Sequence, residues 1–306
     1  MMTNPTDDEP SGLSRIHRRL IEPIEHAAEL SFQHTVFCQT SLPYRNPGDD
    51  VREWQRNQGA VLLLVKAGEA LNPQTNRWER LGLPWGTKPR LILAHLNAEA
   101  LQRGSPIIEV EGSLSAFVRR IRGFDGGREI RAFKDQLTRL SGALVRLAMT
   151  VSDRAFQINS PIISAFELWP ERDRQQRVLW PATIALSREY FDSLQKHAVP
   201  LREADIAALA HSAMALDIYA WLAQRLHRVE PKRAVFIPWA ALQQQFGPDY
   251  SRPRKFRSVF RVALAQVLAR YQAARVELDE CGMMLRNSPP PVGRRLILMP
   301  PSRTPE

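Results

Sequence analysis

The chain has 306 residues and ordinary apolar content, so it can build one large hydrophobic core or two medium ones. It carries 42 Lys and Arg against 32 Asp and Glu, a net charge of +10, which favours a polyanionic partner, nucleic acid before membrane. Its two cysteines, Cys38 and Cys281, form no CxxC pair, which argues against a disulfide framework or a cysteine-based zinc site. The longest strongly apolar run, residues 60–65, is far shorter than the roughly 20 residues that cross a bilayer, and no signal-peptide pattern follows the start. We expect a cytoplasmic protein with reduced thiols.

Sequence patterns predict the elements of the first half in chain order. Residues 1–30 are expected to form a partly disordered tail with a polar start, which includes a short helical region. After this tail, short strands and helices alternate. The predicted elements are a helical region at 13–30 broken by Pro23, a short helix at 51–57, a buried strand at 60–66, its hairpin partner at 77–81, a helix at 87–101 stopped by Gly104, a strand at 107–111, a short helix at 113–121, a glycine-rich turn at 123–127, a long helix at 128–150, and strands at 151–158 and 162–169.

The stretch GLPWGTKPR, residues 82–90, raises the question of a nucleotide site. A phosphate-binding loop has the pattern GxxxxGK, whereas here Gly82 and Gly86 enclose three residues and Thr87 stands where the lysine should be. Pro89 lacks the N–H that such a loop would use, but it fits the first turn of a helix. The stretch therefore predicts a turn that opens the following helix.

The second half repeats the order of the first. Its predicted elements are a strand at 182–187, a helix at 188–197, a long helix at 203–227, a strand at 234–237, a helix at 239–246 between Pro238 and Gly247, a long helix at 254–274, and strands at 275–279 and 294–299 around a loop at 280–293 with three prolines. Each half contains helix, strand, short helix, turn, long helix, strand, loop and strand, the order of a winged helix. We predict an α+β fold of two tandem winged-helix domains, residues 31–177 and 178–299, with a carboxy-terminal tail at 300–306.

The helix at 254–274 is the strongest candidate for DNA binding. The surrounding residues 251–275 hold seven Lys and Arg and no acid, which a merely solvated helix face explains less well. At about 100° per residue, apolar residues such as Phe256 form a buried stripe, and basic residues gather on the opposite side, as a recognition helix requires. The predicted contacts are Arg257 and Arg261 to base edges, Arg252, Arg254 and Lys255 to phosphate, and Ser258 beside them.

The long helix of the first half is a weaker candidate. It exposes Arg128, Arg131 and Lys134, but Glu129 and Asp135 dilute its positive charge. We therefore expect the second half of the chain to bind duplex DNA more strongly, with accessory contacts from the first.

A proline-rich loop at 287–293 is a candidate wing. Arg294 and Arg295 follow it, and arginine suits the negative potential of a narrow minor groove. An ordinary hairpin loop is an equal alternative.

Catalytic patterns are poor in this sequence. No two of the seven histidines are separated by one or three residues, so neither an HxH nickase strand nor HExxH occurs. Asp49 and Asp50 fit a turn before Val51 better than a metal site. Asp217 lies within an apolar helix, where a buried, hydrogen-bonded carboxylate is more common than an active-site acid. We expect no enzyme, no catalytic residue, no metal and no cofactor.

Four segments resemble plasmid-encoded RepA replication initiator proteins of Gram-negative bacteria, and the resemblance extends over residues 32–299. The segments are LPWGTKPRLILAHLNAEALQRGSPIIEVEGSLSAFVRRI, LSREYFDSLQKHAVPL, ALAHSAMALDIYAWLAQRLHR and FRSVFRVALAQVLARYQAARVEL. The resemblance implies an initiator that binds repeated duplex sites (iterons) at a plasmid origin, promotes melting of an adjacent AT-rich region, and recruits the host replication initiator and the replicative helicase.

The same resemblance implies two winged-helix domains, with dimerisation through the first and iteron reading through the second. Carried onto this chain, iteron reading falls to Arg254, Arg257 and Arg261, and an interface to the apolar residues of 60–65 and 78–85. It further implies a homodimer in equilibrium with an active monomer, control of plasmid copy number, and a place in the bacterial cytoplasm on plasmid or nucleoid DNA, without a membrane partner.

Three alternatives stay open. A transcriptional or partition regulator of a plasmid would use the same architecture. A DNA-nicking or priming enzyme is disfavoured by the missing histidine and acid clusters. A protein-interaction module would carry the basic charge incidentally.

Overall fold

The computed structural model describes residues 30–72, 75–109, 116, 118–119, 127–151, 154–166 and 183–293. The expected tails, the helical region at 13–30 except its last residue, most of the glycine-rich turn, the boundary at 177 and 178, and the strand at 294–299 with Arg294 and Arg295 lie outside these residues.

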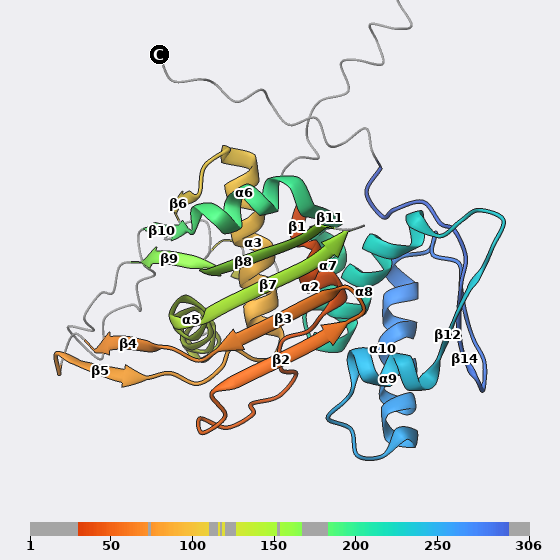
Figure 1. Cartoon of the computed structure of the whole chain (residues 1–306), viewed down its shortest axis with the longest axis horizontal. Helices are drawn as coiled ribbons and strands as arrows, with labels where there is room; N and C mark the ends of the chain where they lie inside the picture. The colour runs from red at the N-terminus through yellow and green to blue at the C-terminus, as the bar shows by residue number, and fades with distance from the viewer. Residues whose placement is uncertain are drawn as a thin grey trace, which may run out of the picture.

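The described part is a mixed α+β structure (Figure 1). Its helices are α2 (Thr35–Gln39), α3 (Thr87–Arg103), α5 (Gly127–Gly142), α6 (Arg188–His197), α7 (Glu203–Leu209), α8 (Ala213–Arg225), the 3-10 helix η2 (Leu226–Arg228), α9 (Trp239–Phe246) and α10 (Pro253–Arg270). Its strands are β1 (Leu30–His34), β2 (Glu53–Gln58), β3 (Val61–Lys66), β4 (Glu69–Asn72), β5 (Arg77–Arg80), β6 (Ile107–Glu109), β7 (Leu144–Val151), β8 (Arg154–Pro161), β9 (Ile163–Phe166), β10 (Thr183–Leu186), β11 (Ala198–Arg202), β12 (Val235–Pro238), β13 (Val276–Leu278) and β14 (Gly282–Leu285).

A four-stranded antiparallel sheet, ordered β2-β3-β7-β8, forms the centre of the amino-terminal part. Residues of β3 alternate, so that Val61, Leu63 and Val65 are buried against the helices while Leu62 is partly exposed on the other face. The prediction of a buried strand here is confirmed. Helix α3 is also confirmed, with Gly104 as its left-handed C-cap, but it is buried around most of its circumference rather than on one face.

Two smaller sheets join residues from both sides of the expected boundary near residue 178. Strand β1 pairs antiparallel with β11, and all five β1 residues are buried. Strand β10 pairs with both β6 and β9. Residues 183–202 therefore complete sheets of the amino-terminal part.

Several strand predictions are wrong. Residues 53–58 form β2 instead of a helix, because this segment alternates and pairs along its whole length with β3. Strand β5 pairs with β4 and not with β3. The strands predicted at 151–158 and 162–169 do not pair with each other. Strand β8 forms a hairpin with β7 instead, and β9 pairs with β10 in another sheet.

The helix expected at 128–150 ends at Gly142. A β-carbon at Gly142 would lie 2.6 Å from the Leu81 side chain, so this last residue of the helix packs too closely for a larger side chain. The following residues form β7, in which Val145 and Leu147 are buried. Leucines at 137, 140, 144 and 147 fit a helical period, whereas the buried residues of the strand, Val145 and Leu147, follow a period of two.

The helix expected at 203–227 is two helices, α7 and α8. Ser212 separates them and caps α8, since its hydroxyl accepts a hydrogen bond from the Ala215 N–H at 3.2 Å. Serine favours this position over a helix interior because its side chain competes for backbone hydrogen bonds.

The carboxy-terminal part holds a three-stranded antiparallel sheet, ordered β12-β14-β13, against which α9 packs (lower right in Figure 1). Helix α10 packs against α9, α8 and α7. Pro238 and Gly247 bound α9 as predicted. Strand β14 falls inside the predicted loop, so the tight hairpin turn is at residues 279–281.

The described part of the proline-rich loop, up to Gly293, which is one candidate for a wing, packs against α10. The Tyr271 hydroxyl donates to the Pro289 carbonyl at 2.7 Å, and Val292 is buried. These residues pack back on the end of α10.

None of the helices in the described part of the chain has the length and apolar character of a membrane span.

Candidate nucleic-acid interface

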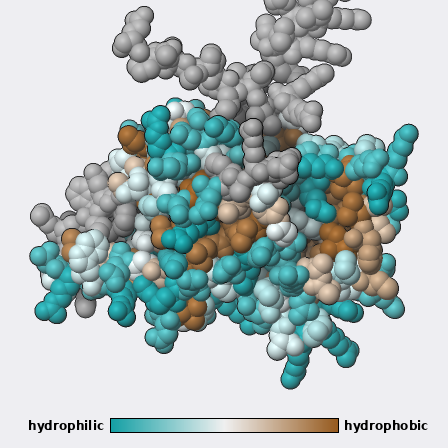
Figure 2. Space-filling view, in the orientation of Figure 1, coloured by the Kyte–Doolittle hydropathy of each residue, from teal (hydrophilic) through white to brown (hydrophobic). Residues whose placement is uncertain are grey.

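The first half of α10 presents an exposed basic face. Phe256 and Phe260 are fully buried and contact Trp239 of α9 edge-to-face, with ring centroids 6.4 and 5.7 Å away. This anchor turns the opposite side of the helix to solvent. The exposed residues there are Arg252, Arg254, Lys255, Arg257, Ser258 and Arg261, as the helical period predicts. Figure 2 shows mostly hydrophilic atoms at the lower edge of the view, where the start of α10 lies in Figure 1, with tan and brown atoms above them on the right.

Two of these arginines are held beside the indole of Trp239. The guanidinium carbons of Arg257 and Arg261 lie 5.5 and 5.2 Å from the ring centroid, within cation–π distance. Arg261 Nη2 also donates to the Asp279 carbonyl at 3.3 Å, and Trp239 Nε1 donates to the same oxygen at 3.2 Å. The carbonyl thus ties α9, α10 and the β13–β14 hairpin together around Arg261.

None of these arginines and lysines pairs with an acid in the part of the chain that the structure describes. Arg270, at the far end of α10, differs, since it pairs with Asp205 of α7 at 3.1 Å. Positive charge is therefore uncompensated at the start of α10 and neutralised at its end, which is the arrangement that a phosphate backbone would require.

The basic residues of α5 lie among acids. Arg139 pairs with Asp135 at 3.0 Å and with Asp49 at 3.3 Å. Lys88 of α3 pairs with Glu129 at 3.5 Å. Of the predicted residues in this helix, Arg128 and Arg131 are exposed and Lys134 is half-buried.

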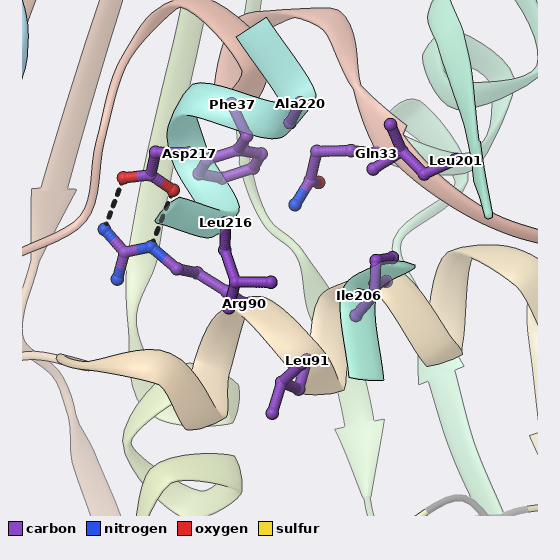
Figure 3. A pocket seen from close by; sticks show the side chains of 10 residues that line it. Gln33, Phe37, Arg90, Leu91, Leu201, Ile206, Leu216, Asp217 and Ala220 are labelled. Carbon is purple, nitrogen blue, oxygen red and sulfur yellow. Dashed lines mark hydrogen bonds and ion pairs between the residues drawn. The ribbon is translucent and has the colours of Figure 1, made fainter. Parts of the chain in front are cut away.

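Asp217 is buried and paired, as predicted, and does not face solvent (Figure 3). Arg90 of α3 donates to both of its carboxylate oxygens, Nε to Oδ1 at 2.7 Å and Nη2 to Oδ2 at 2.8 Å. The Arg90 guanidinium also donates to the carbonyls of Leu42 at 2.8 Å and Gly86 at 2.6 Å. Burial raises the pKa of Asp217, and Arg90 counteracts the shift. The pair links α3, α8 and the GLPWGTKPR turn.

A cavity of about 20 Å³ lies beside this pair, lined by side chains such as Gln33, Phe37 and Ile206. It has room for about one water molecule and is too small for a nucleotide. Among the described residues no group of three or more His, Cys, Asp or Glu side chains is arranged to hold a metal ion.

Sequence reasoning did not identify Trp239 or the Asp279 carbonyl. A tryptophan directly after Pro238 was a signal for the former, because a large ring at a helix start packs against the next helix. The carbonyl could not be found, since it depends on the turn at 279–281.

A family model described as plasmid-encoded RepA protein matches residues 83–240. No curated protein sequence matches the chain significantly. Two solved structures of domains 2 and 3 of RctB are similar to it at 10% sequence identity. One has a TM-score of 0.47 and covers 87% of this chain and 99% of that chain; the other has a TM-score of 0.45 and covers 82% and 94%. Both scores are too low to support a functional inference.

Proposed function

This chain belongs to the family of plasmid-encoded RepA proteins, and from that premise we propose that it initiates plasmid replication by binding duplex sites at the origin through α10. The observation that carries the proposal is the basic face on the first half of α10, whose arginines and Lys255 pair with no acid among the described residues. The buried contact of the helix with Trp239 holds this face toward solvent. Such a face supplies both phosphate and base contacts to a duplex.

The carboxy-terminal part is proposed to be a winged-helix domain. Its order of α8, β12, α9, α10, β13 and β14 and the sheet order β12-β14-β13 support this assignment. Here α9 and α10 would be the helix-turn-helix, and the β13–β14 hairpin the wing. In the amino-terminal part, α3, β6, α5, β7 and β8 follow a similar order and support a first winged-helix domain. Because β10 and β11 complete the sheets of that part, we now propose a division after β11 in place of residue 178.

Within α10, Arg257 and Arg261 are proposed to read base edges, because they lie a helical turn apart on the exposed face. Arg252, Arg254 and Lys255, at the helix start, would bind phosphate, with Ser258 between the two groups. Arg128, Arg131 and Lys134 would add weaker contacts from α5. Arg294 and Arg295 stay candidates by sequence alone.

The finer functions are proposals as well. Recognition of iterons, melting of AT-rich DNA, recruitment of the host initiator and helicase, and copy-number control in the bacterial cytoplasm follow from the family. The apolar residues predicted for a dimer interface are in part wrong, because Val61, Leu63, Val65 and Leu83 are buried in the core. A dimer through the first domain stays a proposal on Leu62, which is 36% exposed, and Trp78, which is 70% exposed.

A footprint of the purified protein on the DNA that flanks its own gene tests the proposal. Protection of direct repeats is expected. A single protected inverted repeat over a promoter would instead identify a transcriptional regulator. Site-specific nicking of supercoiled origin plasmid with magnesium would identify an enzyme, and the proposed non-enzymatic role would then be wrong.

A further inference from the structure

Asp249 is the only acidic residue between Glu230 and Glu277. It lies in the turn between α9 and α10, three residues before Arg252, and its side chain is 62% exposed. Charges on residues only three positions apart can lie within the Debye length, about 10 Å at moderate salt, and salt then screens their interaction only in part. A free carboxylate at this position would therefore repel a phosphate that approaches the start of α10.

The amino-terminal part supplies a cation to this carboxylate. Arg56 of β2 donates from Nη2 to Asp249 Oδ2 at 2.7 Å, and the two residues are 193 positions apart. A second contact joins the same parts of the molecule, since Gln245 Nε2 of α9 donates to the Gln39 carbonyl at 3.2 Å. The first unit of the chain thus contacts the turn that precedes the basic helix.

Arg56 is held in place before it meets Asp249. Its guanidinium carbon lies 3.4 Å from the centroid of the Trp54 ring, and Nη1 donates to the Gln55 carbonyl at 3.0 Å. Trp54 is itself fixed, because its Nε1 donates to the Ser41 carbonyl at 2.7 Å. Only 15% of the Arg56 side chain is exposed. The pair therefore loses less side-chain entropy than an ordinary surface pair, for which that loss cancels most of the attraction.

We propose that Arg56 is a positioning residue for DNA binding, which acts by neutralising Asp249 and so leaves no free carboxylate in the turn before α10. The inference rests on the proposed function of α10. In this role Arg56 does not contact DNA. The amino-terminal sheet nevertheless raises the affinity of α10 for DNA through this residue.

The test measures the affinity for an origin duplex by fluorescence anisotropy over a range of salt concentrations. Arg56→Gln is expected to weaken binding by about threefold to tenfold, because it leaves one carboxylate uncompensated. Asp249→Asn alone is expected to keep or slightly raise the affinity, and the double variant Arg56→Gln with Asp249→Asn is expected to recover wild-type affinity. Lys66→Gln is the matched control, since it removes a cation from the same sheet that pairs with Glu53 at 3.1 Å, away from the turn.

Three results would overturn the inference. Equal affinities of Arg56→Gln and Lys66→Gln would make the ion pair irrelevant to DNA. A double variant that stays weak, with a salt slope reduced by about one, would mean that Arg56 binds phosphate itself. A loss of affinity in Asp249→Asn would mean that the pair orients the turn, and this single variant decides the matter even if Arg56→Gln disrupts the sheet.

Arg257→Ala in the same titration separates the two proposals. Weak binding of Arg257→Ala with unchanged binding of Arg56→Gln rejects only the positioning role. Unchanged binding of Arg257→Ala rejects the proposed α10 site itself.

Discussion

Helices α5 and α10 are the long helices of the two proposed winged-helix domains, yet their charges are used differently. The arginine at the end of α5, Arg139, pairs with Asp135 and Asp49, and Glu129 pairs with Lys88 of α3. On α10, the cations from Arg252 to Arg261 face solvent. Asp249, in the turn before them, is paired with Arg56, and Asp279 contacts Arg261 through its backbone carbonyl. The same order of elements can therefore serve internal cohesion in one half and binding of a polyanion in the other.

The largest expected effect is the loss of DNA affinity when two arginines of α10 are replaced. Replacing Arg257 and Arg261 together by Ala should weaken specific binding to origin DNA by about 2–6 kcal/mol, because each bidentate contact to guanine contributes about 1–3 kcal/mol. Anisotropy titrations with origin and scrambled duplexes measure it. Losses that are equal on both duplexes would assign these arginines to phosphate instead of base edges.

The next effect concerns phosphate contacts at the start of α10. Replacing Arg252, Arg254 and Lys255 by Gln should reduce the slope of log K against log salt by about three, since each phosphate contact contributes about 0.9. Titrations at several salt concentrations give this slope. An unchanged slope would place the DNA backbone elsewhere on the molecule.

A smaller effect is expected on α5. Arg128→Ala with Arg131→Ala should weaken origin binding by at most about 1 kcal/mol, because acids lie close to these positions on the helix. The measurement is the same titration, next to the α10 variants. A loss as large as that of the Arg257 and Arg261 variant would abolish the contrast between the helices.

The smallest effect is expected from a variant that removes an acid from α5 and so makes its exposed charge more like that of α10. Asp135→Asn removes one of the two partners of Arg139 and should raise affinity for duplex DNA at low salt by about 0.3–0.5 kcal/mol, with the gain lost at high salt. Asp192→Asn, which removes the partner of exposed Arg188 on α6, is the matched control. An equal gain in the control would show only the change in net charge.

The elements that the sequence predicts best are those with strong end signals. Gly104 ends α3, Ser187 begins α6, and Pro238 and Gly247 bound α9. Where the end signal is weak, apolar spacing misleads, as in residues 144–150, which suit a helix locally but lie between β3 and β8. Tertiary pairing decides such segments, and no local pattern contains it.

Only the part of the candidate site that lies on one helix is predictable from the sequence. The exposed face of α10 follows from the helical period, because burial of Phe256 and Phe260 fixes the rotation of the helix. The Asp279 carbonyl and Arg56 could not be assigned to this site, since each comes from another element. For Arg56 the partner is 193 positions away.

The pairing of β1 with β11 has a consequence for synthesis on the ribosome. Leu30 pairs with Arg202, and His34 pairs with Ala198, so the first strand has no partner until the chain has grown through residue 202. At a translation rate of about 5–20 residues per second, the apolar side chains of β1 wait roughly 10–30 s for it. A fragment that stops before β11 leaves the edge of β1 unpaired, and an unpaired apolar strand favours aggregation.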